Sequence, residues 1–128
     1  MKNVFLFLPE VIRILVDKGK AGIYALGEVV DDEFLVGYVG RSDTCLQTRL
    51  LTHNYLYDFS YFYFQYTWTP ADAYVQEAGM WHACVDYGIP IRNKIHPDSP
   101  ANTHLKCPYC QSGKIIVQSL ERDWPKTG

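Results

Sequence analysis

Runs of β-branched and aromatic residues mark the expected strands of this chain. Two such runs, Gly22–Val30 and 34–40, lie on either side of an acidic turn at 31–33. Valine, leucine, phenylalanine and tyrosine recur in both runs, which is typical of β-strands. A third run, 61–68, reads YFYFQYTW and is more aromatic still. The pattern predicts a hairpin followed by a third strand of the same sheet.

Two other stretches show helical spacing of apolar residues between start and stop signals. Residues 9–18 begin with proline and are followed by glycine, which predicts an amphipathic helix packed on the sheet. Residues 70–87 follow Thr69, a residue type that caps helices, and precede a glycine that can end one. This second helix is expected to bury a stripe that includes His82 and to carry Glu77 at the edge of that stripe.

A shorter helix is expected from a start signal at 42–44 to about residue 54, with Thr44 and Gln47 at capping-box spacing. The face that it would bury carries Leu46, Arg49, Leu50 and His53. An arginine on a buried face is costly unless an anionic group meets it. Arg49 and His53 are four residues apart and can reach a common target, so the sequence indicates an anion-handling site.

Composition and charge limit the possible functions. Of the 128 residues, 48% are hydrophobic and 15% aromatic, which is enough for one core. We expect a single domain with an N-terminal helical segment at 1–21, a core at 22–95 and a tail at 96–128. The net charge of −2 excludes binding to nucleic acid through a global positive field, so any contact with a polyanion must be local.

The apolar run and the cysteines bear on the expected compartment. The apolar run at 4–8 is too short for a signal peptide or a membrane span. The four cysteines, at 45, 84, 107 and 110, are too few and too unevenly spaced for a secreted disulfide framework. We therefore expect a cytoplasmic protein that does not contact a membrane.

The tail contains a Cys-x-x-Cys pair, Cys107 and Cys110, with His104 three residues before Cys107. This is half of a zinc site, because a closed structural site needs four ligands. His96 or Cys84 could supply the fourth ligand if the fold brings one of them near. Zinc bound at Cys107 and Cys110 would hold the tail in place. The alternative is a pair of free thiols in a tight turn.

Six features in order resemble the GIY-YIG nuclease family over about residues 20–95: Gly22-Ile23-Tyr24, Tyr38-Val39-Gly40, Arg49, His53, Glu77 and Asn93. The resemblance implies an α/β (α+β) fold, with a small three-stranded antiparallel sheet flanked by helices. It also implies a hydrolase. Such an enzyme would be an endonuclease that cleaves phosphodiester bonds of DNA with a single divalent metal ion, Mg²⁺ or Mn²⁺.

The resemblance implies roles for the residues around the phosphate. Tyr24 would activate or orient the attacking water, and Tyr38 would position the phosphate or assist proton transfer. Arg49 would stabilise charge on the phosphoryl oxygens, which suit the geometry of a guanidinium. His53 would hydrogen-bond the same region and could hold the hydroxyl group of Tyr24.

It also implies roles for residues further along the chain. Glu77 would be the only protein ligand of a mostly hydrated Mg²⁺, and Asn93 would support the site from beyond the helix. Arg41, directly after the second tripeptide, would either contact a neighbouring phosphate or be a solvated charge at the strand end.

The alternative function is non-catalytic: a domain on the same fold that binds nucleic acid or protein, with a zinc-stabilised tail. Catalysis requires Glu77, Arg49 and Tyr24 to converge on one cleft, whereas a binding domain requires only a positive surface. Many family members carry a separate DNA-binding domain, for which this chain has no room. DNA targeting is therefore expected to depend on a partner protein or on pairing of two copies.

Overall fold

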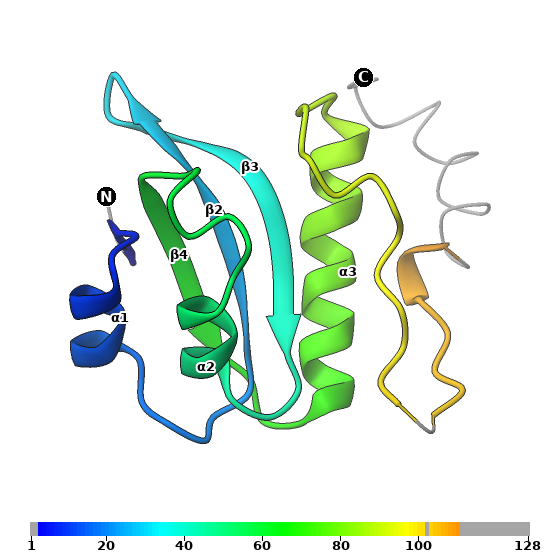
Figure 1. Cartoon of the computed structure of the whole chain (residues 1–128). Coiled ribbons are helices and arrows are strands. Elements are labelled where there is room, and N and C mark those ends of the chain that lie inside the picture. Colours follow the sequence, from blue (N-terminus) through cyan, green and yellow to red (C-terminus); the bar gives the residue numbers. More distant parts are fainter. Residues whose placement is uncertain (1–2, 102, 111–128) are drawn as a thin grey trace.

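One antiparallel sheet organises the chain (Figure 1). The computed structural model describes residues 3–101 and 103–110, so the part of the predicted tail at 111–128 lies outside the described residues. Within the described part, the sheet has four strands in the order β1-β4-β2-β3. They are β1 (Val4–Leu6), β2 (Gly22–Val30), β3 (Glu33–Ser42) and β4 (Tyr61–Tyr66). The predicted mixed α and β fold with an antiparallel sheet flanked by helices is confirmed.

The predicted hairpin is formed by β2 and β3. Its two turn residues, Asp31 and Asp32, have φ angles of 52° and 65°, which matches the left-handed backbone of a type I′ hairpin turn. The boundaries of β2 are those predicted from the sequence. β3 begins one residue before the predicted run at 34–40 and ends two residues after it.

The predicted number of three strands was wrong, because the apolar run near the N-terminus adds β1 to the edge of β4. Phe5 pairs with Phe62 across the two strands. The Phe5 ring centroid lies 6.0 Å from that of Phe62 and 5.9 Å from that of Phe64. Cross-strand aromatic contacts of this kind stabilise a sheet. The N-terminal segment at 1–21 therefore contributes a strand as well as a helix.

Side chains alternate across the sheet, and each face has its own core. On one face, α1 (Pro9–Leu15) and α2 (Leu46–Leu51) pack on the strands; on the other lies α3 (Pro70–Asp86). The first core includes Ile12, Tyr24, Leu26, Leu46, Leu50 and Phe62. The second includes Ala25, Val39, Cys84 and Ile91. Neighbouring residues of β2 thus belong to different cores.

α3 begins at the predicted residue and ends at Asp86, one residue before the predicted end. The Thr69 side chain accepts a hydrogen bond from the backbone N–H of Asp72 at 3.0 Å, and Gly88, with φ at +72°, follows the last turn. Among the residues that the structure describes, no helix has the length and apolar character needed to cross a membrane.

α2 is shorter than predicted and ends at Leu51. Its N-cap residue is Cys45, whose side chain makes no capping bond, so the predicted capping box of Thr44 and Gln47 was wrong. The reason is tertiary: Gln47 is buried, and its Nε2 donates to the carbonyl oxygen of Val16 at 2.9 Å. The Gln47 side chain, which the capping box would have used, instead bonds α2 to the residue that follows α1.

The difference between the two caps can be tested by alanine substitution. We expect Thr69→Ala to lower the free energy of unfolding by about 1 kcal/mol, because the Asp72 N–H loses its acceptor. Thr44→Ala is the matched control, and we expect it to change stability by less than about 0.5 kcal/mol. Urea denaturation measures both. Equal losses from the two variants would contradict this assignment of the caps.

Candidate active site

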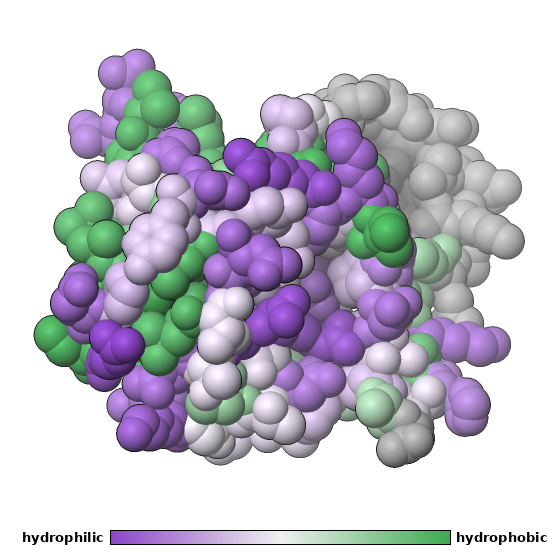
Figure 2. All heavy atoms as spheres, in the orientation of Figure 1, coloured by the Kyte–Doolittle hydropathy of each residue, from purple (hydrophilic) through white to green (hydrophobic). Residues whose placement is uncertain are grey.

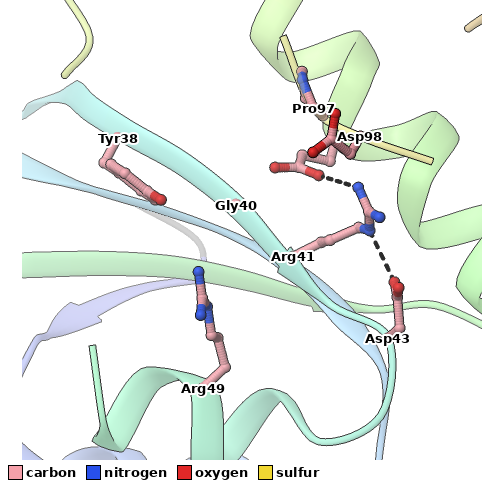
Figure 3. A pocket seen from close by; sticks show the side chains of 8 residues that line it. Tyr38, Gly40, Arg41, Asp43, Arg49, Pro97 and Asp98 are labelled. Atoms are coloured by element: carbon pink, nitrogen blue, oxygen red, sulfur yellow. Dashed lines mark hydrogen bonds and ion pairs between the residues drawn. The ribbon is translucent and has the colours of Figure 1, made fainter. Parts of the chain in front are cut away.

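A cavity of about 240 Å³ opens at the edge of β3, between α2 and α3. Its lining residues are Tyr38, Gly40, Arg41, Asp43, Arg49, Glu77, Pro97 and Asp98. In Figure 2, hydrophilic residues gather in the middle of this face of the molecule. Figure 3 shows β3 crossing the cavity, with Tyr38 and Arg49 on one side of the strand and Arg41 and Asp98 on the other.

The register of the hairpin explains how both faces of the sheet reach one cavity. Tyr24 lies opposite Gly40, and Ile23 lies opposite Arg41. Because side chains alternate, Tyr38 lies on the face covered by α2, whereas Arg41 points to the face covered by α3. β3 is an edge strand, so groups from its two faces can meet around its open side.

Gly40 leaves the space that the Tyr24 ring occupies. Tyr24 is fully buried, and a Cβ atom added at Gly40 would overlap Cζ and Oη of Tyr24. The Tyr24 ring also stacks on Tyr38, with centroids 6.2 Å apart and planes inclined by 15°. The glycine of the second tripeptide therefore determines where the tyrosine of the first one lies.

The hydroxyl group of Tyr24 accepts a hydrogen bond from Nε of Arg49 at 3.2 Å. Burial raises the pKa of Tyr24 well above its usual value, and Arg49 offsets only part of this effect. The phenolate is therefore scarce at neutral pH. Tyr24 is also not among the residues that line the cavity. In this arrangement Tyr24 holds Arg49, whose guanidinium group faces the cavity.

Arg49 is exposed, so the prediction that it lies on the buried face of α2 was wrong. The helix buries Leu46, Gln47 and Leu50 instead. Because Gln47 is drawn inward toward α1, the buried face of the helix is rotated away from Arg49. The guanidinium group consequently keeps access to water and to any anion that enters the cavity, and it incurs little desolvation cost.

His53 follows α2 and packs edge-on against Tyr24 and Tyr38, at centroid distances of 5.4 and 4.9 Å. Its Nδ1 accepts from the backbone N–H of Tyr55 at 3.1 Å, which places the proton of the neutral ring on Nε2. Nε2 is buried and has no partner among the described residues. The predicted hydrogen bond from His53 to the Tyr24 hydroxyl is therefore not formed.

Burial, reinforced by the charge of Arg49, lowers the pKa of His53 from 6.5 to about 4. The ring is then neutral at pH 7. A buried N–H group without a partner is uncommon in proteins. The ring of His53 thus packs beside Tyr24 and Tyr38 without adding charge to the site.

Glu77 reaches the cavity from α3 and is paired with Arg41. Nη1 of Arg41 lies 2.7 Å from Oε1 of Glu77, and Nε of Arg41 lies 2.8 Å from Oδ1 of Asp43. The side chain of Arg41 is 13% exposed, so it is not a solvated charge at the strand end, because its position on β3 turns it toward α3. Burial raises the pKa of Glu77, although Arg41 opposes this shift.

The charges around the cavity suit a divalent cation better than a bare anion. The lining contains two guanidinium groups and three carboxylates, those of Asp43, Glu77 and Asp98. Carboxylate oxygens are the ligands that Mg²⁺ prefers. A carboxylate has about four lone-pair sites, so the bond from Arg41 to Oε1 still allows Oε2 of Glu77 to bind a cation. One carboxylate with a free oxygen is what a mostly hydrated Mg²⁺ or Mn²⁺ ion requires of a protein, and Glu77 has such an oxygen.

Asn93 lies outside the cavity and holds β3. Its Oδ1 accepts from the backbone N–H of Val39 at 3.2 Å, and its Nδ2 donates to the Val39 carbonyl oxygen at 2.7 Å. Its own carbonyl oxygen accepts from Nε1 of Trp81 at 2.9 Å. Asn93 thus pairs with the edge strand as another strand would, and it fixes the backbone between Tyr38 and Gly40.

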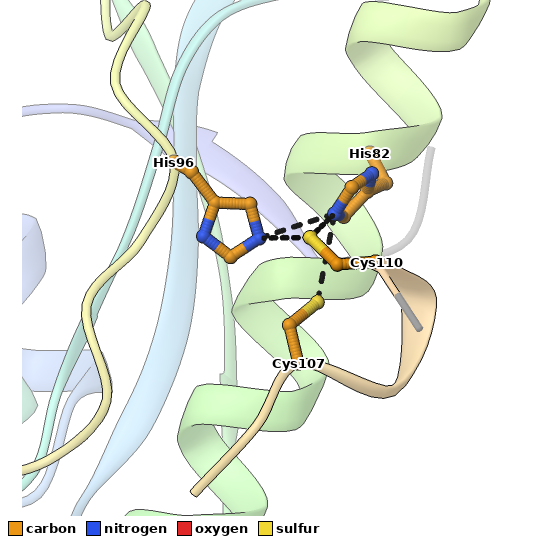
Figure 4. A group of neighbouring side chains, drawn as sticks. All are labelled: His82, His96, Cys107 and Cys110. Atoms are coloured by element: carbon orange, nitrogen blue, oxygen red, sulfur yellow. Dashed lines mark hydrogen bonds between the residues drawn. The ribbon is translucent and has the colours of Figure 1, made fainter. Parts of the chain in front are cut away.

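A second group of side chains beside α3 could hold a metal ion (Figure 4). It consists of His82, His96, Cys107 and Cys110, whose ligand atoms all lie within 4.8 Å of one another. Both predicted cysteines belong to it, as does His96, one of the two candidates for the fourth ligand.

The other predicted zinc ligands do not belong to this group. Cys84 is buried in the core under α3, and His104 is exposed. His82 was not predicted as a ligand, because its position in the apolar stripe of α3 does not distinguish a ligand from a core residue. Its distance of 25 residues from Cys107 also gives no motif spacing.

The close approach at Gly40 predicts an energetic coupling with Tyr24. We expect Gly40→Ala to lower the free energy of unfolding by about 1–3 kcal/mol, because the added methyl group overlaps the ring. In a Tyr24→Leu background the same substitution should cost less, since the overlapping atoms are gone. A double-mutant cycle in urea measures the coupling. A coupling of zero would show that the ring does not constrain Gly40.

The lowered pKa of His53 predicts a pH dependence of stability. The unfolded chain, with a His pKa near 6.5, binds more protons than the folded chain, with a pKa of about 4. Stability is therefore retained above pH 6.5 and lost as the pH falls from 6.5 toward 4. We expect His53→Asn, which keeps an acceptor for Tyr55, to reduce this loss. Thermal unfolding across this pH range tests it, and parallel profiles for the two proteins would exclude the effect.

Comparisons with known proteins identify no relative of this chain: no known family, no curated protein and no solved structure matches it. The resemblance to the GIY-YIG nucleases therefore rests on the six sequence features named above.

Proposed function

We propose that this chain is a metal-dependent endonuclease of the GIY-YIG type that hydrolyses phosphodiester bonds of DNA. The observation that supports this most strongly is the meeting of Tyr38, Arg49 and Glu77 at one cavity. Of the three residues expected to converge, Arg49 and Glu77 line the cavity, whereas Tyr24 lies behind it and contacts it only through Arg49. These residues come from β3, α2 and α3, and no local sequence pattern requires them to meet. A hydroxyl group, a guanidinium group and a carboxylate around one opening match the needs of phosphoryl transfer.

Arg49 is the proposed phosphate ligand. Its Nε is engaged by the Tyr24 hydroxyl, which leaves the two terminal amino groups to donate to phosphoryl oxygens as a fork. Tyr24 acts here as a positioning residue, because its hydroxyl is buried and its pKa is raised. Fixing the guanidinium before the substrate binds reduces the ordering needed in the transition state.

Tyr38 is the proposed contact for the attacking water and the phosphate, and His53 is a positioning residue behind it. Tyr38 lines the cavity and can orient water toward phosphorus. His53 does not line the cavity and its Nε2 is buried, so its role is to hold the Tyr38 ring, against which it packs. In the reaction, the water oxygen forms a bond to phosphorus as the bond to the leaving oxygen breaks, and in net one proton passes from the water to the leaving oxygen. Charge develops on the oxygens that Arg49 faces.

Glu77 would hold the Mg²⁺ or Mn²⁺ ion, and this ion would offset charge on the leaving oxygen. Arg41 has a different role from Arg49. Paired with Glu77 and Asp43, it opposes protonation of the buried Glu77 carboxylate and orients it before a cation binds. A single partner on Oε1 fixes the direction of the other oxygen.

The charges around the cavity support the alternative function, a non-catalytic binding domain, less well. A domain that only bound DNA would require a positive surface, whereas carboxylates outnumber guanidinium groups around this cavity. We also infer that the metal ion of the tail is zinc and that its role is structural, since thiolate and imidazole ligands favour zinc over Mg²⁺.

Cleavage of DNA in the presence of Mg²⁺ tests the proposed function. The substrates are plasmid, flap, fork and single-stranded DNA. We expect Glu77→Gln to lower the cleavage rate by about 100-fold or more, because the cation ligand loses its charge. Arg49→Lys should also lower the rate, since an ammonium group cannot bond both Tyr24 and a phosphate as a fork.

Glu33→Gln is the matched control, because it removes a carboxylate that is exposed and outside the cavity. We expect this variant to cleave at the wild-type rate. Wild-type protein that is folded and binds DNA without cleaving any substrate would favour the binding domain. Equal cleavage by the wild type and Glu77→Gln would place the nuclease activity elsewhere or in a contaminant.

A further inference from the structure

Four metal-ligating side chains from three separate stretches converge beside α3 (Figure 4). His82 comes from α3, His96 from the segment after it, and the two cysteines from the Cys-x-x-Cys stretch, in which residues 108–110 are helical. Nε2 of His82 lies 3.1 Å from Nε2 of His96, 3.5 Å from Sγ of Cys107 and 3.3 Å from Sγ of Cys110. Sγ of Cys110 lies 3.2 Å from Nε2 of His96.

These separations are those of ligands around one small ion. A tetrahedral zinc site with its usual bond lengths places two nitrogens about 3.3 Å apart and a nitrogen and a sulfur about 3.6 Å apart. The observed distances lie within a few tenths of an ångström of these values. Four protein ligands occupy all four coordination positions of a tetrahedral zinc ion. This is typical of a structural site, because a catalytic site leaves one position for water or substrate.

The hydrogen bond on the other side of the His96 ring supports the same assignment. Nδ1 of His96 lies 2.7 Å from the carbonyl oxygen of Pro97. A carbonyl oxygen only accepts, so the proton of the neutral ring is on Nδ1 and the lone pair of Nε2 points into the cluster. A metal-bound histidine is usually held in this way by an acceptor at its second nitrogen.

The residues next to His96 connect this cluster with the cavity. Segment 93–98 is fixed at its start, where Asn93 bonds to β3 and to Trp81. Beyond Asn93 it belongs to no helix or strand, and Ile95 is 83% exposed. His96 then contacts His82 and Cys110 in the cluster. Pro97 and Asp98 follow directly and line the cavity.

We propose that His82, His96, Cys107 and Cys110 bind one Zn²⁺ ion in a closed tetrahedral site, which holds segment 93–98 where Pro97 and Asp98 form one rim of the cavity. Ligands on α3, on this segment and on the 107–110 stretch are joined through the ion. The metal site itself is independent of the proposed nuclease function, whereas its effect on catalysis rests on that function.

Metal analysis of the purified full chain tests the site. We expect one zinc ion per chain in the wild type, and close to none in Cys110→Ser and His96→Ala. The matched controls are Cys45→Ser and His104→Ala, which remove a thiol and an imidazole outside the cluster and should keep the zinc. Loss of the zinc in both controls, its retention in both ligand variants, or another metal in the wild type would overturn the proposal.

Removal of the zinc from the wild-type protein with a chelator tests the same site without a substitution, so a ligand variant that fails to fold does not prevent the test. The indole N–H of Trp81 donates to Asn93, and its ring lies 5.1 Å from that of His96. We expect the NMR signal of this N–H, assigned with Trp81→Phe, to shift on zinc removal and return when Zn²⁺ alone is added. Trp68 is 95% exposed, and its signal should not move. An unchanged Trp81 signal would show that the ion does not hold segment 93–98.

Cleavage assays then separate this inference from the proposed function. We expect Glu77→Gln to lose cleavage and keep its zinc, and the zinc-free wild type to cleave more slowly until Zn²⁺ is restored. Failure of the nuclease proposal would appear as absence of cleavage with the zinc site intact. Full cleavage by the zinc-free protein would overturn the proposed effect on the cavity rim.

Discussion

The pairing of β2 with β3 in one register is the constraint on which the rest of the structure depends. It places Tyr24 opposite Gly40, the position where the ring finds space. It also sends Tyr38 toward α2 and Arg41 toward α3. A shift of the pairing by one residue would exchange these faces. The tyrosine that holds Arg49 and the arginine that holds Glu77 would then be separated from their partners, and the cavity would lose both of its charged sides.

The ion pair between Arg41 and Glu77 opposes the protonation that burial favours. Burial alone favours the protonated form of Glu77, and the nearby guanidinium opposes this. A buried pair of this kind contributes little net stability, because desolvation offsets most of the attraction. Its value lies in orientation, since a fixed carboxylate loses less freedom when a cation binds. The two arginines thus differ in role: Arg41 orients a protein carboxylate, and Arg49 faces the proposed substrate.

α3 serves two sites at once. Glu77 points to the cavity, and His82, five residues later, points to the cluster with His96, Cys107 and Cys110. A helix turns by 100° per residue, so these two positions lie on different sides of it. The segment after α3 links the two sites, because its Asn93 bonds to the edge strand β3 and its His96 belongs to the cluster. One rigid helix therefore fixes the proposed catalytic carboxylate and the proposed zinc site relative to each other.

The sequence by itself determined the hairpin, the ends of α3 and the presence of an antiparallel sheet with helices, because these depend on local alternation, turn residues and caps. It also identified Tyr38, Arg49 and Glu77, which line one cavity. Only the tertiary structure decided the fourth strand, the exposure of Arg49, the pairing of Arg41 and the inclusion of His82 in the metal cluster. Each of these depends on a contact between residues far apart in the chain. Alternation and helical spacing describe which side of an element a residue occupies, but not what the fold places against that side.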